Sequence, residues 1–284
     1  MRFGRIELAN LPNRNEQINM EHDPLFELDQ SARQAATDGF YFNQAGEPVE
    51  WSLQINNAVE STVSIPPDRI LKEPVERRYQ QTNITIENIT TTSAAKALHD
   101  EGKKPLALNF ANGYTPGGGF LNFGCRAQEE VLCRMSALYQ TLEKDPMYEV
   151  HCNTGGTEGS SWAILSPDVP VFRDDNYNAL DAPWPLSFIS CAAPEADSVG
   201  QPRSTTLLRK RIHRVLEIAE SYGYSSLVLG AWGCGAFGNN PQTTALDFKY
   251  ALQDKFRGAF ETVVFAIYDV SGEGENITAF KDAF

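Results

Sequence analysis

The sequence lacks the features of several large classes of protein. No stretch approaches the roughly 20 uninterrupted apolar residues that a membrane helix requires, and the first residues contain no apolar run typical of a secretory signal. The five cysteines form no CxxC pair, and the four histidines form no HExxH pattern. These absences predict a cytoplasmic protein that does not enter a membrane, has no disulfide framework and holds no metal.

Positive charge is scarce in the chain. The 24 Lys and Arg residues are outnumbered by 37 Asp and Glu residues, and the formal net charge is -13. Sequence-independent binding of nucleic acid needs an excess of Lys and Arg to displace counterions from phosphates, so we expect no nucleic-acid partner. A single phosphate-bearing ligand is still compatible with this charge, because backbone N–H groups in glycine loops and at helix N-termini can bind a diphosphate.

The chain does contain a long alternation of strand and helix patterns. From residue 83 onward this rhythm predicts an α/β domain, in which a mostly parallel sheet lies between two layers of helices. Turn and proline signals separate residues 1–75, a mainly helical accessory region packed on the core, from a core of residues 76–284. The expected strands are 84–89, 106–110, 162–165, 186–191, 227–231 and 263–268, and the expected helices are 23–39, 93–101, 128–143, 204–222 and a segment after Pro241.

A first glycine-rich segment joins an expected strand to an expected helix. Residues 106–130 read LALNFANGYTPGGGFLNFGCRAQEE, so three consecutive glycines precede Gln128, Glu129 and Glu130 at the helix start. An acid pair in a first helical turn is common, because it complements the helix dipole. Consecutive glycines, however, are conformationally costly unless a positive φ or a close backbone approach is needed. We therefore interpret this segment as a loop that contacts a ligand.

A second glycine-rich segment, SSLVLGAWGCGAFGNNP at residues 225–241, contains the pattern GxGxxG after a strand. This pattern is typical of dinucleotide-binding folds, and Asp269 would be the candidate ribose-binding acid. Three residues, 239–241, separate the glycines from the next helix, and the distance to Asp269 exceeds the usual interval. Only residues 239–284 follow the last glycine, which is too little chain for such a fold. A dinucleotide-dependent oxidoreductase is therefore disfavoured.

Together the two segments resemble the signature of the poly(ADP-ribose) glycohydrolases. Three glycines followed after eight residues by Gln-Glu-Glu, downstream of Asn-Phe-Ala, match this signature, and the flanking sequence is similar to the bacterial branch. The resemblance extends over about residues 40–270. It implies a macrodomain-like three-layer α/β/α sandwich with a mixed, mostly parallel sheet and an N-terminal helical extension.

The resemblance also implies roles for individual residues. Glu130 would be the general acid/base that protonates the leaving oxygen of a ribose–ribose bond. The adjacent Glu129 points about 100° away on a helix, so it would bind ribose hydroxyls, and the diphosphate of the substrate would stabilise the cationic transition state. The second segment would wrap the pyrophosphate with its backbone N–H groups. The expected substrate contacts are Asn112, Gly117, Gly118, Gly119, Phe120, Gln128, Gly233, Cys234, Gly235, Ala236, Phe237 and Gly238.

The implied activity is the release of ADP-ribose from poly(ADP-ribose), mainly from chain ends, by a monomer that needs no cofactor. ADP-ribosylated proteins would carry the polymer. Two alternatives stay open: a non-catalytic protein that binds ADP-ribose, which the presence of Glu130 disfavours, and a hydrolase of single ADP-ribose units on protein or nucleic acid. For Asn109 and Asn112 a turn-capping role competes with substrate contact, and no residue carries a recognisable adenine-binding motif. The basic residues Arg209, Lys210, Arg211 and Arg214 are interpreted as a solvated helix face.

Overall fold

The computed structural model describes residues 24–73, 79–122, 124–154, 156–269 and 274–284, and within them seven strands form one sheet. The strand order is β3-β6-β7-β5-β8-β9-β4. Strands β7, β5, β8, β9 and β4 pair in parallel, whereas β6 is antiparallel to both of its neighbours. The bounds are β3 Val63–Ile65, β4 Asn83–Glu87, β5 Pro105–Ala111, β6 Ala163–Arg173, β7 Ala179–Ala192, β8 Ser226–Leu229 and β9 Thr262–Ala266.

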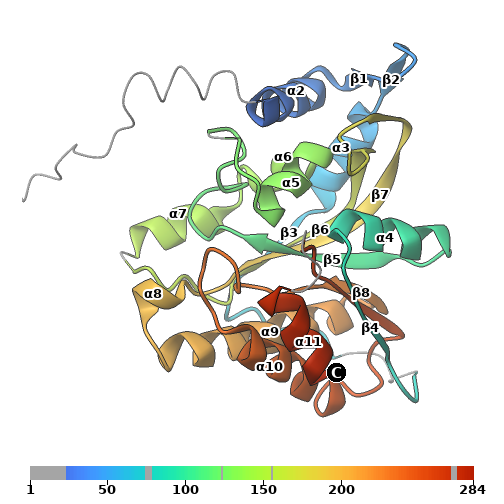
Figure 1. The fold of residues 1–284 in the computed structure, drawn as a ribbon. Coiled ribbons are helices and arrows are strands. Elements are labelled where there is room, and N and C mark those ends of the chain that lie inside the picture. Colours follow the sequence, from blue (N-terminus) through green and yellow to red (C-terminus); the bar gives the residue numbers. More distant parts are fainter. Residues whose placement is uncertain (1–23, 74–78, 123, 155, 270–273) are drawn as a thin grey trace, which may run out of the picture.

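Helices cover both faces of this sheet (Figure 1). One layer consists of α9 (Arg203–Ser221), α10 (Pro241–Gln253) and α11 (Glu275–Ala283). The other contains α3 (Ser52–Ser61), α4 (Thr91–Asp100), α5 (Gln128–Met135) and α6 (Leu138–Leu142). Two further helices of the core region are α7 (Pro146–Asn153) and α8 (Ala196–Val199). The predicted three-layer α/β/α sandwich with a mixed, mostly parallel sheet is confirmed.

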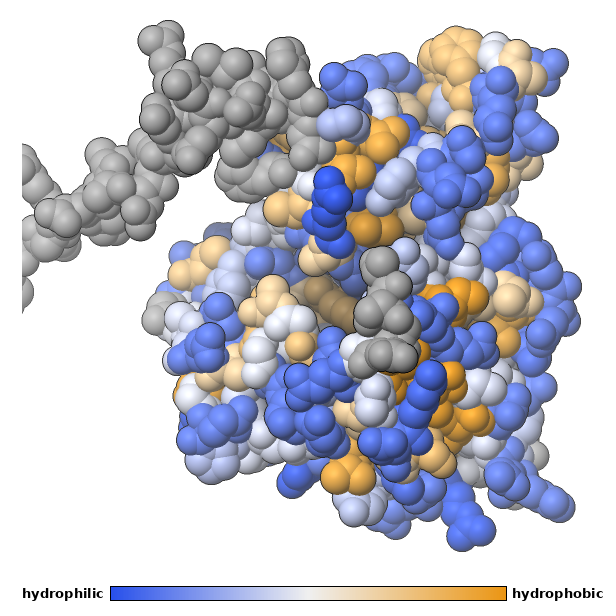
Figure 2. All heavy atoms as spheres, in the orientation of Figure 1, coloured by the Kyte–Doolittle hydropathy of each residue, from blue (hydrophilic) through white to orange (hydrophobic). Residues whose placement is uncertain are grey.

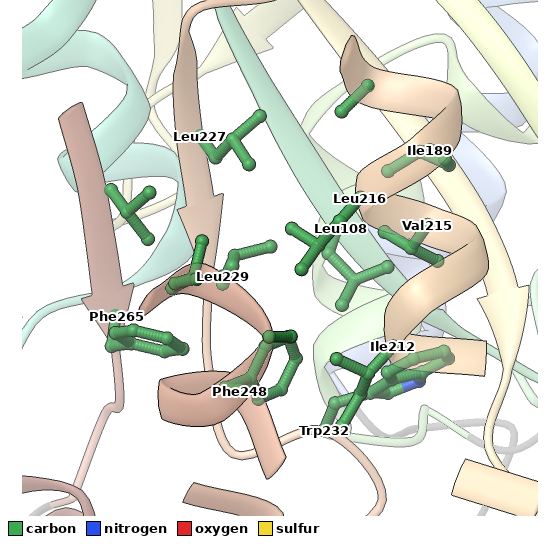
Figure 3. Close-up of a cluster of buried hydrophobic side chains, with 14 of the residues drawn as sticks. Leu108, Ile189, Ile212, Val215, Leu216, Leu227, Leu229, Trp232, Phe248 and Phe265 are labelled. Atoms are coloured by element: carbon green, nitrogen blue, oxygen red, sulfur yellow. The ribbon is translucent and has the colours of Figure 1, made fainter. Parts of the chain in front are cut away.

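Each face of the sheet has its own apolar core because side chains alternate between the faces along a strand. In β5, Leu108 packs in the core beneath α9 and α10, and its neighbour Ala107 packs in the core beneath α4 and α5. Figure 3 shows the first of these cores, where Leu108 and Phe265 of the sheet meet Ile212 and Phe248 of the helices. The two cores fix the positions of the strand ends that carry the site.

The described part of the accessory region contains more than helices. It comprises α2 (Pro24–Asp38), β1 (Phe40–Phe42), β2 (Pro48–Glu50), α3 and β3. Helix α2 confirms the helix expected over 23–39. Strand β3 pairs with β6, so this region adds an edge strand to the main sheet, and Trp51 is buried in the core beneath α5. The boundary near residue 75 stays a prediction.

The prediction of one helix over 128–143 is wrong, because the chain breaks between α5 and α6. Ser136 is extended at the break, with φ -145 and ψ 174, and forms a bridge with Val171 of β6. Its hydroxyl donates to the carbonyl of Leu132 and accepts from the amide of Leu138, at 2.7 and 3.2 Å. These side-chain bonds replace helical backbone bonds. Apolar periodicity missed the break because Leu132 and Leu138 are buried on both sides of it.

Candidate active site

The carboxyl ends of the parallel strands meet at one edge of the sheet, which is where α/β proteins usually bind ligands. The segments that follow β4, β5, β7, β8 and β9 line two cavities there. Figure 2 shows that the surface is hollowed near the middle of the visible face, with apolar residues inside the hollow. Both glycine-rich segments recognised in the sequence follow strands that end at this edge.

The first cavity, called here the apolar cavity, has a volume of about 350 Å³. Its lining comes from the start of α4, the start of α5, the loop after β8 and the segment after β9. Gln128 and Phe237 were expected at the site and do line this cavity, whereas Thr90 and Tyr268 were missed. The missed residues carry no motif. Their one signal is their position just after the carboxyl ends of β4 and β9.

The second cavity, called here the Tyr114 cavity, also has a volume of about 350 Å³. Asn112 and Tyr114 contribute from the segment after β5, and residues 156–159 form another part of the lining. Phe237 and Ala193 line both cavities, so the two adjoin at these residues. An extended ligand can therefore occupy both cavities and pass Phe237.

The acid pair begins α5, and its two carboxylates have different partners. Glu129 is 3% exposed; its Oε2 accepts from the backbone N–H of Asn112 at 2.7 Å, and its Oε1 accepts from Asn109 Nδ2 at 3.2 Å. Glu130 is 7% exposed, and its Oε1 accepts from the backbone N–H of Gly119 at 2.8 Å. The Oε2 of Glu130 is buried and has no hydrogen-bond partner among the described residues. Within the pair, Glu130 alone keeps an oxygen for a ligand.

Burial also changes the protonation of Glu129. Loss of hydration raises the pKa of Glu129 to about 8, against the opposing effect of hydrogen bonds from Asn112 and Asn109. The nearby Glu130 carboxylate raises this pKa further. Glu129 therefore holds its proton at neutral pH, which reduces the repulsion within the pair.

The three glycines of the first glycine loop (residues 117–119) allow the backbone to approach the acid pair. Gly117 and Gly118 have φ of +68 and +58, a region that side chains disfavour. A Cβ at Gly118 would lie 2.5 Å from Glu130 Oε1, and one at Gly119 would lie 2.6 Å from Cys125 Sγ. Close approach is thus required, as the sequence suggested, but the closest neighbours of Gly118 are the protein's own carboxylates.

Gln128 connects three elements at the start of α5. Its Oε1 accepts from the amide of Phe110 at 2.8 Å, and its Nε2 donates to the carbonyl of Leu108 at 2.8 Å and to Thr91 Oγ1 at 3.1 Å. These bonds fix α5 against β5 and α4. Asn112 has a comparable local role, because its Oδ1 accepts from two backbone N–H groups in the following turn.

Hydrogen bonds of Asn239 fix the second glycine loop (residues 233–238). No role in the site was predicted for this residue from the sequence. Asn239 Nδ2 donates to the carbonyls of Pro194 and Gly233 at 2.7 and 3.1 Å, and its Oδ1 accepts from Ser204 Oγ at 2.6 Å. Gly235 and Ala236 face the apolar cavity. Burial raises the pKa of Cys234 to about 11, so its thiol stays protonated at neutral pH.

Comparisons with known proteins agree on one family. Residues 30–174 match the family model for the catalytic domain of microbial-type PARG. The crystal structure of poly(ADP-ribose) glycohydrolase from Thermomonospora curvata has a TM-score of 0.86 and 34% identity, covering 92% of this chain and 99% of that one. The chain belongs to the microbial-type poly(ADP-ribose) glycohydrolases. The predicted resemblance to the bacterial branch is confirmed, and with it the assignment to the glycosidases.

Other solved structures of the same family carry ligands. The Deinococcus radiodurans glycohydrolase in complex with ADP-ribose has a TM-score of 0.72 and 35% identity, covering 81% of this chain and 96% of that one. The Thermomonospora curvata glycohydrolase bound to the inhibitor ADP-HPD has a TM-score of 0.83 and 34% identity, with coverage of 92% and 99%. No match is found among curated protein sequences.

Two residues of this glycohydrolase are buried, although from the sequence one was expected at the substrate and the other in solvent. Phe120 is buried and packs against Tyr139 at 5.4 Å between ring centroids. Like the first glycine loop and the acid pair, it lines neither cavity. Arg211 is buried as well, so its interpretation as part of a solvated helix face is wrong. It donates to the carbonyls of Ala192 and Glu158 and thereby secures the loop at residues 156–159 beside the Tyr114 cavity.

The described residues also carry little that points to a metal or a membrane. In them, no three His, Cys, Asp or Glu side chains come together as a group that would hold an ion. No helix in these same ranges has the length and apolar character needed to span a bilayer.

Proposed function

We propose that this chain hydrolyses the ribose–ribose O-glycosidic bonds of poly(ADP-ribose), with Glu130 as general acid/base, and releases ADP-ribose mainly from chain ends. The position of Glu130 carries the proposal. One of its oxygens is fixed by the amide of Gly119, and the other is buried without a partner among the described residues. A carboxyl group held in this way is oriented for proton transfer to and from a bound substrate.

In the proposed reaction Glu130 acts twice, first as an acid and then as a base. Glu130 gives its proton to the oxygen that leaves as the bond to the anomeric carbon breaks, through an oxocarbenium-like transition state. Water then adds to the anomeric carbon, and its proton passes to the Glu130 carboxylate. Glu129 is poorly suited to be a nucleophile, because both of its oxygens accept N–H groups. Its binding of ribose hydroxyls and the help of the substrate diphosphate stay predictions.

We place the substrate across the two cavities. The apolar cavity suits the adenosine, and Gly233, Gly235 and Ala236 of the second glycine loop line it, so their backbone can face a diphosphate. Phe237 lines both cavities and would pack against a ribose. The complex of the Deinococcus radiodurans glycohydrolase with ADP-ribose supports a ligand of this chemistry.

The preference for chain ends rests on the loop at residues 156–159. The Tyr114 hydroxyl donates to the carbonyl of Gly156 at 2.8 Å and accepts from the amide of Gly159 at 2.9 Å. With Arg211 on the carbonyl of Glu158, the loop is held at three points beside the Tyr114 cavity. A fixed wall there would leave no path for a polymer that continues beyond the ribose being cleaved.

The products released from polymer of defined length test this proposal. Early samples of a digest should contain free ADP-ribose and chains shortened stepwise from one end. Oligomers of intermediate length at the first time points would contradict end-directed cleavage. Release from singly modified protein alone would contradict the polymer substrate. The cytoplasmic location, the monomeric state and the protein carriers of the polymer stay predictions.

A further inference from the structure

An ion pair between the accessory region and α5 lies entirely inside the protein. Arg134 Nε of α5 donates to Asp29 Oδ1 of α2 at 2.5 Å, and both side chains are 0% exposed. Such a pair usually contributes little net stability, because burial removes the hydration of both charges. Stability alone is therefore a weak explanation for this pair, and its position next to the acid pair suggests another.

Arg134 connects Asp29 to the first glycine loop. It follows Glu130 by four residues on α5, so the two side chains leave the same face of the helix. The Nη2 of Arg134 donates to the backbone carbonyl of Cys125 at 2.8 Å. The Cys125 thiol in turn lies against Gly119, whose amide binds Glu130 Oε1. A continuous series of contacts thus runs from Asp29 to the carboxylate of Glu130.

A second arginine, Arg173, holds α2 in place without a hydrogen bond to the carboxylate of Asp29. Arg173 of β6 donates from Nη1 to the carbonyls of Leu28 and Arg134, at 3.0 and 3.1 Å, and from Nη2 to Ser31 Oγ at 2.8 Å. Helix α2 is therefore anchored to the sheet even without Asp29. The carboxylate of Asp29 adds the orientation of Arg134 and a counter-charge for it.

We propose that Asp29 is a positioning residue for the hydrolysis. By fixing Arg134 it holds the Cys125 carbonyl, and with it the amide of Gly119 that orients Glu130. The accessory helix α2 is then part of the catalytic apparatus. This inference rests on the proposed function, because its effect is on the rate of hydrolysis. Asp29 and Arg134 line neither cavity, so their effects on kcat and on ADP-ribose affinity are measured separately.

Two variants of the full chain test the proposal: Asp29→Asn, which removes the charge and keeps the shape, and the double variant Asp29→Leu/Arg134→Met. Apolar residues of similar volume often replace a buried ion pair without loss of folding, so the double variant decides if Asp29→Asn does not fold. Misplacement of a reacting group by about 1 Å can lower the rate about 100-fold. We expect kcat to fall at least about tenfold while the Kd for ADP-ribose, from calorimetry, and the KM for polymer stay unchanged.

Asp247→Asn is the matched control, because Asp247 is also a buried acid that pairs with an arginine, Arg209, away from the acid pair. It should keep the wild-type kcat. A folded double variant with wild-type kcat would overturn the positioning role. So would a fall in kcat matched by an equal loss of ADP-ribose affinity, because general distortion predicts that pattern. If the wild type releases no ADP-ribose, the proposed function fails as well; if it does, unaffected variants reject the positioning role alone.

Discussion

The two glycine loops share a composition but differ in what surrounds their glycines. In the first loop a Cβ at Gly118 or Gly119 would meet a carboxylate or a thiol of the protein within 2.6 Å. In the second loop a Cβ at Gly235 would meet nothing within 4 Å, and one at Gly238 would meet its nearest atom at 3.9 Å. The first loop is closed around the protein's own acid pair. The second is open at Gly235 and Gly238 but closed at Gly233, where a Cβ would lie 2.7 Å from Ala193 Cβ.

This difference separates two duties that glycine-rich sequence alone does not distinguish. A loop packed on Glu130 orients the reacting group, so changes there should lower the rate. An open loop leaves space for a ligand to approach the backbone, so changes there should lower affinity. The expected signature is therefore a change in kcat for the first loop and a change in Kd for the second.

Among changes near the first glycine loop, Glu130→Gln should lower kcat the most. The amide keeps the shape and can still accept from the amide of Gly119, but it cannot transfer a proton. Loss of general acid/base catalysis predicts a fall in kcat of about 10²- to 10⁴-fold, with ADP-ribose binding retained. Steady-state hydrolysis of polymer and calorimetry measure the two. Glu149→Gln, an acid in the first turn of α7, should behave as wild type, and an unchanged rate in Glu130→Gln would exclude the assignment.

Glu129 should make stability fall as pH rises. The unfolded chain releases this proton near pH 4.5, whereas the folded protein keeps it up to about pH 8, because burial raises the pKa of Glu129. The folded state binds more protons in this window, so the free energy of unfolding decreases from pH 4.5 to 8. The shift corresponds to about 5 kcal/mol at most.

Urea unfolding of wild type and Glu129→Gln at several pH values isolates this contribution. The variant should lose the part of the slope that Glu129 supplies, whereas Glu149→Gln should keep the wild-type slope. Parallel slopes for wild type and Glu129→Gln would show that Glu129 is ionised in the folded protein.

Gly118→Ala tests the closed character of the first loop directly. The new methyl group would lie against Glu130 Oε1 and would also force alanine into positive φ. We expect kcat to fall about 100-fold through misplacement of Glu130. Gly102→Ala is the control, since Gly102 has φ +81 but open space around its Cβ and should lose only about 1 kcal/mol of stability. Equal stability losses with a normal rate would mean that Glu130 tolerates the methyl group.

Phe237→Ala tests whether the second glycine loop contributes to ligand affinity. Removing the ring that lines both cavities should weaken ADP-ribose binding by about tenfold, measured by calorimetry, with little change in Tm. Phe42→Ala is the control, because Phe42 lies on β1 and is 59% exposed. Unchanged affinity in Phe237→Ala would place the ligand away from the junction of the cavities.

Gly235→Ala should have the smallest effect and complete the contrast with Gly118→Ala. Its φ is compatible with alanine and its Cβ has no neighbour within 4 Å, so stability should change by less than about 0.5 kcal/mol. The methyl group enters space meant for the ligand, so affinity should fall by less than in Phe237→Ala while kcat is kept. A large loss of stability would show that the second loop is closed like the first.

Local sequence patterns were sufficient for the elements that carry the site. The strand before the first glycine loop and the helix that starts at Gln128 were expected from periodicity, and the structure has both as β5 and α5. The end of that helix was not, because Ser136 leaves the helix to pair with Val171, a partner distant in sequence. Arg211 was misjudged for a similar reason, since a basic helix face looks solvated until the carbonyls that it contacts are known.

The layers, the two glycine loops, the acid at the start of α5 and the family were all predictable from local sequence, because each depends on residues close together along the chain. Three features became visible only in the folded protein: the free oxygen of Glu130, the place of Phe237 where two cavities adjoin, and the contact of Asp29 with Arg134. These features depend on burial and on contacts between distant segments. Burial and these contacts set the charge and the orientation of a side chain, and a local sequence pattern carries no information on either.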